Sequence, residues 1–173
     1  MSYVSSNATQ SVVSSVTQGT ANTQILGLQV VVTGTLSPLA VTNINFNTNG
    51  TTLPADITQA KVYYTGTSST FATTTQFGTA YLNPNGTFSV TGSQALSGGG
   101  ANTTNYFWLV YDVSCNATVA DVLDAEVPSF NIGASNYVPT TTAPSGSRAI
   151  SALYTPTRTD GNSTTAITVG AVN

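Results

Sequence analysis

The sequence contains no histidine and a single cysteine, Cys115. Without histidine, neither a Ser-His-Asp nor a Cys-His catalytic arrangement can form, and histidine-based metal clusters are excluded as well. A lone cysteine cannot form an intrachain disulfide, and no histidine is present to activate its thiol. We therefore interpret Cys115 as an inert small side chain and predict that the chain is not an enzyme.

Charge is also scarce. Charged residues make up 5% of the chain, whereas an average soluble protein has about 25%. Lys61, Arg148 and Arg158 are the only cations, so no basic stripe exists that could neutralise nucleic acid phosphates. No apolar run reaches the roughly 18 residues of a membrane helix, and the N-terminus lacks the pattern of a secretory signal. We expect no nucleic acid partner and no membrane insertion. We interpret the chain as a mature form, a fragment or a protein released without such a signal.

Hydrophobic residues nonetheless make up 40% of the sequence, in short alternating runs typical of β-strands. The clearest run, residues 105–113 (Asn-Tyr-Phe-Trp-Leu-Val-Tyr-Asp-Val), contains the only tryptophan. Alternate side chains of a strand point to opposite faces, and both faces of this run are apolar. One face carries Tyr106, Trp108 and Val110, and the other carries Phe107, Leu109, Tyr111 and Val113. Because both faces need cover, we predict a central strand of a packed sheet.

Further strands are predicted on either side of this one, with turn residues between them. They span residues 24–33, 39–47, 60–66, 87–96, 122–132 and 148–154, with a weaker strand pair in 71–82. Asn83-Pro-Asn-Gly86 is the clearest hairpin signal, because Asn-Gly accepts the positive φ angles of a tight turn. Helical periodicity is absent. Strands spaced by roughly ten residues indicate an all-β fold, a single antiparallel β-sandwich of Ig-like type.

A chain of 173 residues suits one such domain. We predict that the sandwich occupies residues 23–154. Residues 1–22 are rich in Thr, Ser and Gln and are predicted to form an extended N-terminal segment. Residues 155–173 are predicted to form a C-terminal tail with a short apolar strand at 166–172.

Several phrases, in this order, resemble the β domain that precedes BNR-repeat neuraminidases and recurs in secreted surface proteins of Bacteroidetes. They lie at residues 25–30, 34–39, 60–67, 76–79, 105–113, 123–125 and 146–148. The resemblance covers about residues 3–152 and implies a non-catalytic β-sandwich module of cell-surface or adhesin-like arrays. It does not imply sialidase activity, because the Asp-box repeats of the propeller (Ser-x-Asp-x-Gly-x-Thr-Trp) are missing. The resemblance leaves residues 155–173 unexplained.

Acidic residues gather late in the chain, at Asp112, Asp121, Asp124 and Glu126. Carboxylates in loops at one end of a sandwich could bind Ca²⁺, which takes six to eight oxygen ligands. The spacing matches no EF-hand, so solvated turn residues are the alternative. No other cofactor is expected. A pair of carboxylates could also cleave a glycosidic bond, but the sequence indicates no cleft for it.

Three further residue groups have both a functional and a structural interpretation. Tyr63, Tyr81 and Tyr137, with Tyr3, Tyr64 and Tyr154, could form a platform for sugars or could simply cap the core. Lys61 could form an isopeptide bond if it is buried beside a carboxylate, and is otherwise a solvent-facing strand residue. Asn-x-Thr/Ser glycosylation sequences occur at six positions, as expected by chance in so Asn- and Thr-rich a chain: Asn7, Asn49, Asn85, Asn102, Asn116 and Asn162.

We therefore expect a non-catalytic structural module, a self-assembling subunit of an extracellular surface structure, filament or virion. Sparse charge lets copies pack without repulsion, and a terminal segment could complete a sheet edge of the next subunit as a homo-oligomer forms. The first candidate for this assembly strand is the segment with Val4, Val12, Val13 and Val16, and the second is residues 166–172. The alternative is a glycan-binding adhesin module of a secreted Bacteroidetes protein, with a cell-surface glycan as partner. Either function places the chain outside the cell.

Overall fold

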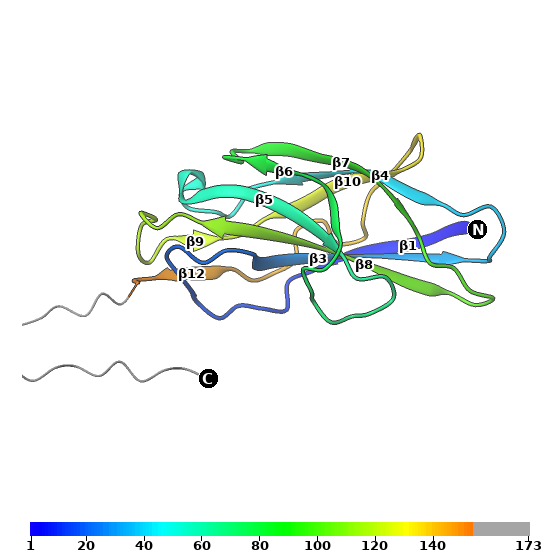
Figure 1. The fold of residues 1–173 in the computed structure, drawn as a ribbon, viewed down its shortest axis with the longest axis horizontal. Coiled ribbons are helices and arrows are strands. Elements are labelled where there is room, and N and C mark those ends of the chain that lie inside the picture. Colours follow the sequence, from blue (N-terminus) through cyan, green and yellow to red (C-terminus); the bar gives the residue numbers. More distant parts are fainter. Residues whose placement is uncertain (154–173) are drawn as a thin grey trace, which may run out of the picture.

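Two antiparallel sheets packed face to face make up most of the protein (Figure 1). The computed structural model describes residues 1–153. The large sheet has the order β1 (Ser2–Thr9), β3 (Thr23–Thr33), β8 (Thr103–Val113), β5 (Ile57–Tyr64), β6 (Gln76–Leu82). The facing sheet has the order β11 (Ser135–Tyr137), β10 (Glu126–Ile132), β4 (Ala40–Asn47), β7 (Thr87–Ala95). The predicted all-β, antiparallel sandwich is confirmed.

A small third sheet closes one end of the sandwich. It contains β2 (Val16–Thr17), β12 (Arg148–Ser151) and β9 (Val122–Leu123), with β12 in the middle. β12 runs parallel to β2 and antiparallel to β9. One turn of 3₁₀ helix, η1 (Pro54–Asp56), precedes β5. No helix in residues 1–153 has the length and apolar character needed to cross a membrane.

β8 is the central strand of the large sheet, as its two apolar faces predict. It lies between β3 and β5 and is antiparallel to both. Phe107, Leu109 and Tyr111 point into the core between the sheets and are at most 1% exposed. On the outer face Trp108 is 6% exposed, and the Phe71 ring packs edge-on against it, 6.0 Å between centroids. The strand is therefore covered on both faces.

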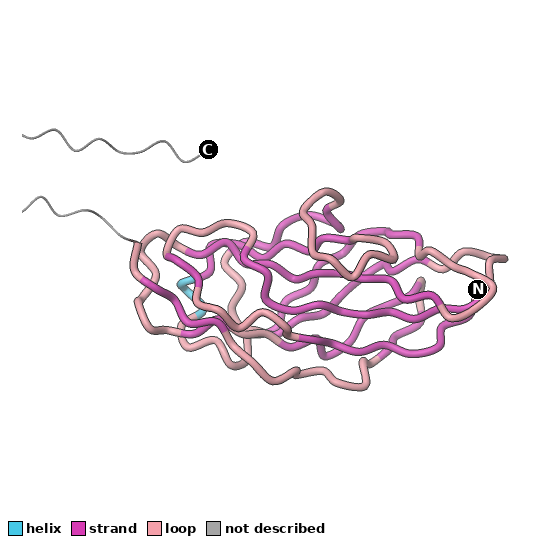
Figure 2. The backbone as a smooth tube through the Cα atoms, turned by 90° about the horizontal axis from the view of Figure 1, so that it is seen from below, coloured by secondary structure: helices cyan, strands magenta, loops and turns pink. Residues whose placement is uncertain are grey.

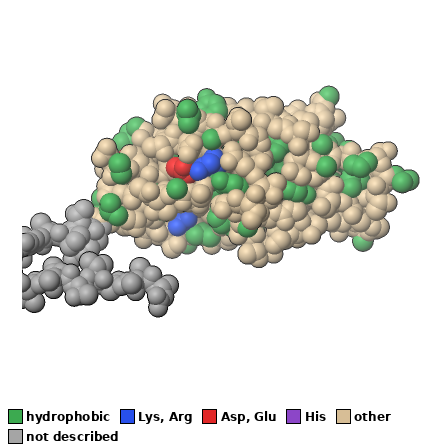
Figure 3. All heavy atoms as spheres, viewed as in Figure 1, with side chains coloured by type: hydrophobic (Ala, Val, Ile, Leu, Met, Phe, Trp, Pro, Cys, Tyr) green, Lys and Arg blue, Asp and Glu red, His purple; other side chains and the backbone are tan. Residues whose placement is uncertain are grey.

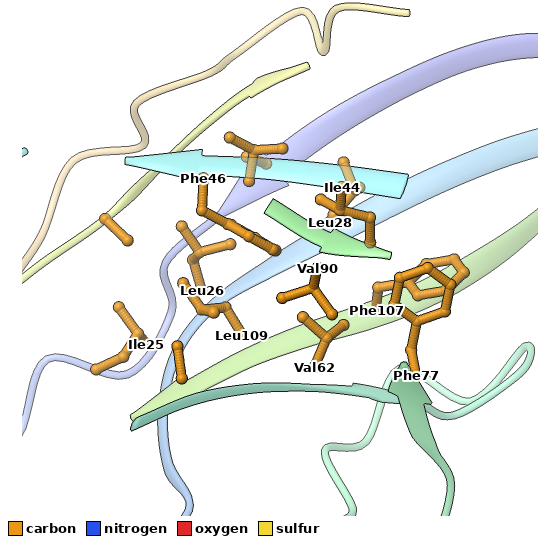
Figure 4. Packing of buried hydrophobic residues seen from close by; sticks show 14 of the residues in the cluster. Ile25, Leu26, Leu28, Ile44, Phe46, Val62, Phe77, Val90, Phe107 and Leu109 are labelled. Carbon is orange, nitrogen blue, oxygen red and sulfur yellow. The ribbon is translucent and has the colours of Figure 1, made fainter. Parts of the chain in front are cut away.

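The core fills the space between the sheets (Figure 4). Strands β3, β5, β6 and β8 contribute from one side, and β4 and β7 from the other. Burying each large apolar side chain contributes about 1.5–3 kcal/mol relative to exposure, so this layer holds the sheets together. The residues labelled in the figure are Ile25, Leu26, Leu28, Ile44, Phe46, Val62, Phe77, Val90, Phe107 and Leu109.

The hairpin predicted at Asn83–Gly86 is wrong, although the chain does turn there. Asn83 has φ 47° and Gly86 has φ 72°, as the turn signal predicts. β6 pairs with β5 in the large sheet, however, and β7 pairs with β4 in the facing sheet. The turn thus carries the chain from one sheet to the other. The edge strands β6 and β7 approach each other closely, since an added Cβ at Gly78 of β6 would overlap the carbonyl oxygen of Thr91 of β7.

The N-terminal residues form part of the sandwich. The prediction that residues 1–22 lie outside a domain that begins at residue 23 is therefore corrected. β1 pairs antiparallel with β3, and β2 joins the small sheet. Ser6 and Ala8 are small enough to fit beneath the facing elements and are 2% exposed. The outer edge of β1 is also bonded: Thr140 N–H donates to the Ser6 carbonyl, and Ala8 N–H to the Thr141 carbonyl. A polar sequence with few large apolar residues therefore forms an edge strand.

Other predicted strands change in extent. Residues 122–132 are two strands in different sheets, β9 and β10, because the chain leaves one sheet at Asp124–Ala125. In residues 71–82 only β6 is a strand, and the residues before it form a loop. β12 ends at Ser151, and the strand predicted at 166–172 lies outside the described residues.

The two ends of the described chain lie at opposite ends of the long axis. Met1 lies at the end where β1 begins, beside the β3–β4 loop, with its amino group donating to the Leu36 carbonyl. The described residues leave the sandwich after β12, at the end closed by the small sheet (Figure 1). A view from below shows the same arrangement (Figure 2). The chain therefore passes through the domain lengthwise.

Candidate functional site

A polar cluster on the outer face of the large sheet gathers around Asp112 of β8. The Lys61 ammonium of β5 lies 2.8 Å from Asp112 Oδ1, and their side chains are 11% and 14% exposed. Gln59 Nε2 donates to Asp112 Oδ2 at 2.5 Å, and the backbone N–H of Asn22 donates to Oδ1 at 2.7 Å. Charged side chains are rare on this face of the molecule (Figure 3). Diagonal neighbours on adjacent strands thus form an ion pair with further hydrogen bonds.

The charge state of this pair bears on the isopeptide bond suggested for Lys61. Burial alone would raise the pKa of Asp112, but the Asn22 amide, Lys61 and Gln59 lower it below its ordinary value. Condensation to an amide requires an uncharged amine, and a carboxylate held in its charged form opposes the step. The proximity needed for the bond is present, but the electrostatics favour an ion pair.

The four acidic residues predicted as a calcium cluster do not come together. Asp112 is held by Lys61 on the outer face of the large sheet. Asp124 lies in the β9–β10 link, where its Oδ1 accepts from the Ala125 amide. Glu126 accepts from Asn49 Nδ2 at 3.2 Å. Within residues 1–153 no three His, Cys, Asp or Glu side chains are grouped so as to hold a metal. Nearness in sequence does not predict nearness in space here, because β8 and β10 belong to different sheets.

The net pKa shift of Asp124 is opposite to that of Asp112. Burial raises the pKa of Asp124, the hydrogen bond from the Ala125 backbone amide opposes this rise, and the Glu126 charge adds to it. An added Cβ at Gly50, which has φ 85°, would contact the Asp124 side chain. This carboxylate therefore packs against the turn between β4 and η1, where Thr51 Oγ1 donates to the Asp124 carbonyl at 2.8 Å.

Asp56 is an acidic site that sequence reasoning did not identify. It ends η1, is 4% exposed, and accepts the Thr118 amide on Oδ1 at 3.0 Å. Its other oxygen, Oδ2, is buried without a hydrogen-bond partner. Burial raises the pKa of Asp56, the hydrogen bond from the Thr118 backbone amide opposes this rise, and the Asp121 carboxyl group beside it raises the pKa further. A single Asp after Pro-Ala carries no motif that could have indicated this pairing.

The three tyrosines predicted as a glycan platform lie in three different places. Tyr63 is buried on the outer face of the large sheet, 7% exposed. Tyr81 of β6 packs against Phe88 of β7, with 5.1 Å between ring centroids. Tyr137 of β11 packs against Tyr3 of β1, with centroids 4.1 Å apart. They do not form a common surface. Tyr81 and Tyr137 pack against the core residues Phe88 and Phe130, whereas the Tyr63 hydroxyl donates to Asn22 Oδ1 on the outer face. Tyr154 lies outside the described residues.

A hollow lies in the β5–β6 connection. Its volume is about 330 Å³, and hydroxyl side chains make up most of its lining. Trp108 Nε1 donates to Thr65 Oγ1 at 2.8 Å, which ties this loop to the central strand. The lining residues are Tyr64, Thr65, Gly66, Ser68, Thr70, Ala72, Thr74 and Thr75.

The four valines predicted for the assembly strand differ in environment. Val16 is buried in the small sheet at 5% exposure, and Val12 is half-buried. Val4 and Val13 are 43% and 58% exposed. In this structure the segment therefore contributes to its own sandwich mainly through Val16 and the small residues of β1. Cys115 is exposed in the loop that follows β8.

The comparisons with known proteins agree with the resemblance found in the sequence. The family model for the N-terminal domain of BNR-repeat neuraminidases matches residues 5–136. The match begins within β1 and ends within β11, so it includes strands of both large layers of the sandwich. No curated protein matches the chain.

Proposed function

Because the chain belongs to the family of N-terminal domains of BNR-repeat neuraminidases, we propose that it is a non-catalytic structural module. In this proposal it forms a repeating, self-assembling subunit of an extracellular surface structure, filament or virion. The absence of histidine and the ion-paired state of Lys61 and Asp112 support a role without catalysis.

The observation that carries the proposal is the position of the two ends. Met1 and the last described residue, Leu153, lie at opposite ends of the long axis (Figures 1 and 2). Units joined end to end would therefore extend in length rather than fold back. A head-to-tail contact that does not close produces a filament. With charged residues at 5% of the chain, neighbouring copies would repel each other little.

Exchange of β1 is the assembly mechanism that we favour. In the structure β1 fills the edge of its own large sheet through pairing with β3. Residues 10–15, which link β1 to β2, contain no strand and could serve as a hinge. The same backbone hydrogen bonds would form if β1 of one copy filled the edge of the next copy, so exchange would cost little enthalpy.

A covalent lock tests this mechanism. Asn7 and Gln29 are direct partners in the β1–β3 register, and both are half-buried. Antiparallel partners lie about 4.5–5.5 Å apart, within the Cα separation that a disulfide accepts. We would introduce Asn7→Cys and Gln29→Cys together with Cys115→Ser, and measure mass by light scattering over a range of concentrations.

We expect the natural chain to form concentration-dependent assemblies, and the oxidised locked variant to remain monomeric. The same variant with its disulfide reduced is the matched control and should assemble again. Assembly of the oxidised variant would exclude β1 exchange, and a monomeric natural chain at every concentration would remove the self-assembling role. Truncating residues 1–22 is a less clean test, because it removes β1 and β2 from their sheets.

Glycan binding is the second candidate, and one observation favours it. The hydroxyl-lined hollow of about 330 Å³ in the β5–β6 connection could form hydrogen bonds to a sugar. A glycan array probed with the natural chain and with a Thr70→Val, Thr74→Val variant tests this role. Binding that the variant loses would support it, and a blank array with and without calcium would exclude it.

A further inference from the structure

The hollow in the β5–β6 connection is built by a loop that its own hydrogen bonds hold in place. Thr65 Oγ1 donates to the Ser68 carbonyl at 2.7 Å, and the Ser68 amide donates back to the Thr65 carbonyl at 3.1 Å. The far side of the loop is fixed to the end of β5, because the Tyr64 N–H donates to the Thr75 carbonyl at 2.8 Å. A site whose walls are already ordered loses little conformational freedom when a ligand binds.

Three aromatic rings lie on the outer face of the large sheet beside this hollow. Trp108 Nε1 donates to Thr65 Oγ1 at 2.8 Å, so the indole ring reaches the wall of the hollow. Phe71, carried by the same loop, packs edge-on against the indole, and Tyr106 lies nearly parallel to it with 6.0 Å between ring centroids. Tyr106 also borders the hollow through its backbone, because its N–H donates to the Gly66 carbonyl at 2.9 Å. Trp108 is buried, whereas Tyr106 is half-buried and keeps part of its ring accessible.

Hydroxyl groups beside an accessible aromatic ring suit a sugar. The C–H groups on one face of a pyranose ring are apolar and pack on an aromatic face, while the hydroxyl groups at its rim exchange hydrogen bonds with protein hydroxyls. Thr70 and Thr74 are exposed at the hollow. Ser68 Oγ accepts from the Thr70 N–H at 3.2 Å, which uses an acceptor position of that hydroxyl and not its hydrogen. Ligand pockets span about 300–1,000 Å³, so a hollow of about 330 Å³ suits one sugar ring rather than an oligosaccharide.

The charge around the hollow distinguishes neutral from acidic sugars. None of its lining residues is charged, and the chain has a net charge of -3. Two basic side chains lie within residues 1–153, and both are engaged elsewhere. Lys61 is held by Asp112. Arg148 donates to the carbonyl oxygens of Ser14 and Gln24. A carboxylated sugar would therefore lose hydration in the hollow without gaining a counter-charge.

We propose that the β5–β6 hollow binds a single neutral hexose residue, which stacks on the Tyr106 ring. The hydroxyl groups of Ser68, Thr70 and Thr74 form the hydrogen bonds that orient it. The inference rests on the glycan-binding candidate above, and it names the ligand class and the ring that recognises it. Sialic acid and uronic acids do not fit this site. Assembly through β1 is a separate matter, since β1 and β6 form opposite edges of the large sheet.

The only tryptophan reports on this site, because Trp108 contacts both the Thr65 hydroxyl and the Tyr106 ring. The full chain is titrated with methyl β-galactoside, methyl β-glucoside and methyl α-mannoside while tryptophan fluorescence is followed. The corresponding methyl uronides, which carry a carboxylate in place of the hydroxymethyl group, are the matched anionic probes. We expect at least one neutral glycoside to bind saturably, with a dissociation constant on the order of 10⁻³ M for so small a ligand. Its uronide should bind about tenfold more weakly or worse.

Four variants locate the binding. Tyr106→Phe keeps the ring and should bind as the natural chain does. Tyr106→Ala removes it and should weaken binding roughly three- to tenfold, the effect of one aromatic contact. Thr74→Val removes a hydroxyl with little change of shape and should weaken binding by a similar factor. Tyr81→Ala removes a ring that is 40% exposed on β6, away from the hollow, and is the matched control. Melting temperatures measured in parallel show whether each variant is folded.

Weaker binding in Tyr106→Ala and Thr74→Val, with normal binding in Tyr106→Phe and Tyr81→Ala, would support the site. Three outcomes would overturn it while leaving glycan binding elsewhere on the protein possible: full binding by both weakened variants, equal loss in Tyr106→Phe, or a uronide that binds as tightly as its neutral partner. Silence towards all three neutral glycosides, in a chain that binds other sugars on a glycan array, would overturn the neutral-hexose assignment. An array that is blank throughout would remove the glycan-binding candidate and this inference together.

Discussion

Removing the charge of Asp112 is the most informative perturbation of the outer face. Asp112→Asn keeps the size of the side chain but leaves the Lys61 ammonium, 11% exposed, without its counter-charge. It also replaces an acceptor oxygen with an NH₂ group, although Gln59, Lys61 and the Asn22 backbone N–H all donate to this carboxylate and need an acceptor there. Lys61→Met removes the partner charge while keeping an apolar stem.

The expected magnitude follows from the burial and the hydrogen bonds. Breaking one side of a buried ion pair costs about 3–5 kcal/mol, and hydrogen bonds to charged groups contribute about 1.5–3 kcal/mol each. Because the pair lies near the surface, we expect Asp112→Asn to lower the free energy of unfolding by about 3 kcal/mol. That corresponds to a melting temperature lower by about 6–12 °C for a domain of this size. The double variant should lose less than the sum of the two single variants.

The same interaction makes a prediction about pH. The pKa of Asp112 is lowered in the folded state, so its contribution is present above the unfolded value, about 3.9, and is lost as pH falls through the folded value. The difference in stability between the natural chain and Asp112→Asn should therefore be constant near neutrality and shrink below about pH 4. Comparing the two at each pH cancels the opposite contributions of Asp56 and Asp124, whose pKa values are raised.

Urea denaturation of the natural chain, the two single variants and the double variant gives the coupling energy directly. A coupling below about 0.5 kcal/mol would refute the argument, since exposed pairs already reach that value. Intact mass provides a second check. We expect the unmodified mass, and a loss of one water would show that Lys61 and a carboxyl have condensed to an amide, contrary to the charge state argued above.

Three further predictions concern the packing of the sandwich. Gly78→Ala should destabilise the domain strongly in urea, because its Cβ would meet the Thr91 carbonyl at φ 65°, whereas Gly86→Ala at φ 72° meets nothing and should cost only about 1 kcal/mol. Phe46→Ala, at a side chain 1% exposed, should cost about 3–5 kcal/mol in thermal unfolding, and a cost below 1 would contradict the core assignment. Burial raises the pKa of Tyr111 in the folded state, so stability should fall as pH rises above about 10, and ultraviolet titration should show this phenol ionising only on unfolding.

The central strand could be predicted from sequence because its information is local. Residues 105–113 are apolar at every second position on both faces, and only a covered strand tolerates that pattern. The turn at Asn83–Gly86 is local too, and the positive φ angles appear where the sequence places them. Which strands the turn connects is not local. β6 and β7 pair with β5 and β4, and those partners are chosen by packing across the whole domain.

The candidate sites show the same division. Asp112, Asp121, Asp124 and Glu126 are close in sequence, yet β8 and β10 lie in different sheets and carry Asp112 away from Glu126. Asp56, far from Asp121 in the chain, reaches it because η1 and the loop at residues 114–121 meet at one end of the sandwich. Burial is likewise a tertiary property, since no spacing rule distinguishes Asp56 from a solvated turn residue.

The sequence by itself determined the fold class, the central strand and the exclusion of histidine chemistry. Apolar alternation and turn residues are visible in neighbouring residues, and composition is a count over the chain, so none of the three requires knowing which distant segments meet. Tertiary structure alone decided the rest: that β1 belongs to the domain, that the three tyrosines lie apart, and that Asp56 meets Asp121. The physical reason is that strand pairing satisfies backbone hydrogen bonds between distant segments. A polar strand such as Ser2–Thr9 is therefore held by its neighbours more than by its own side chains.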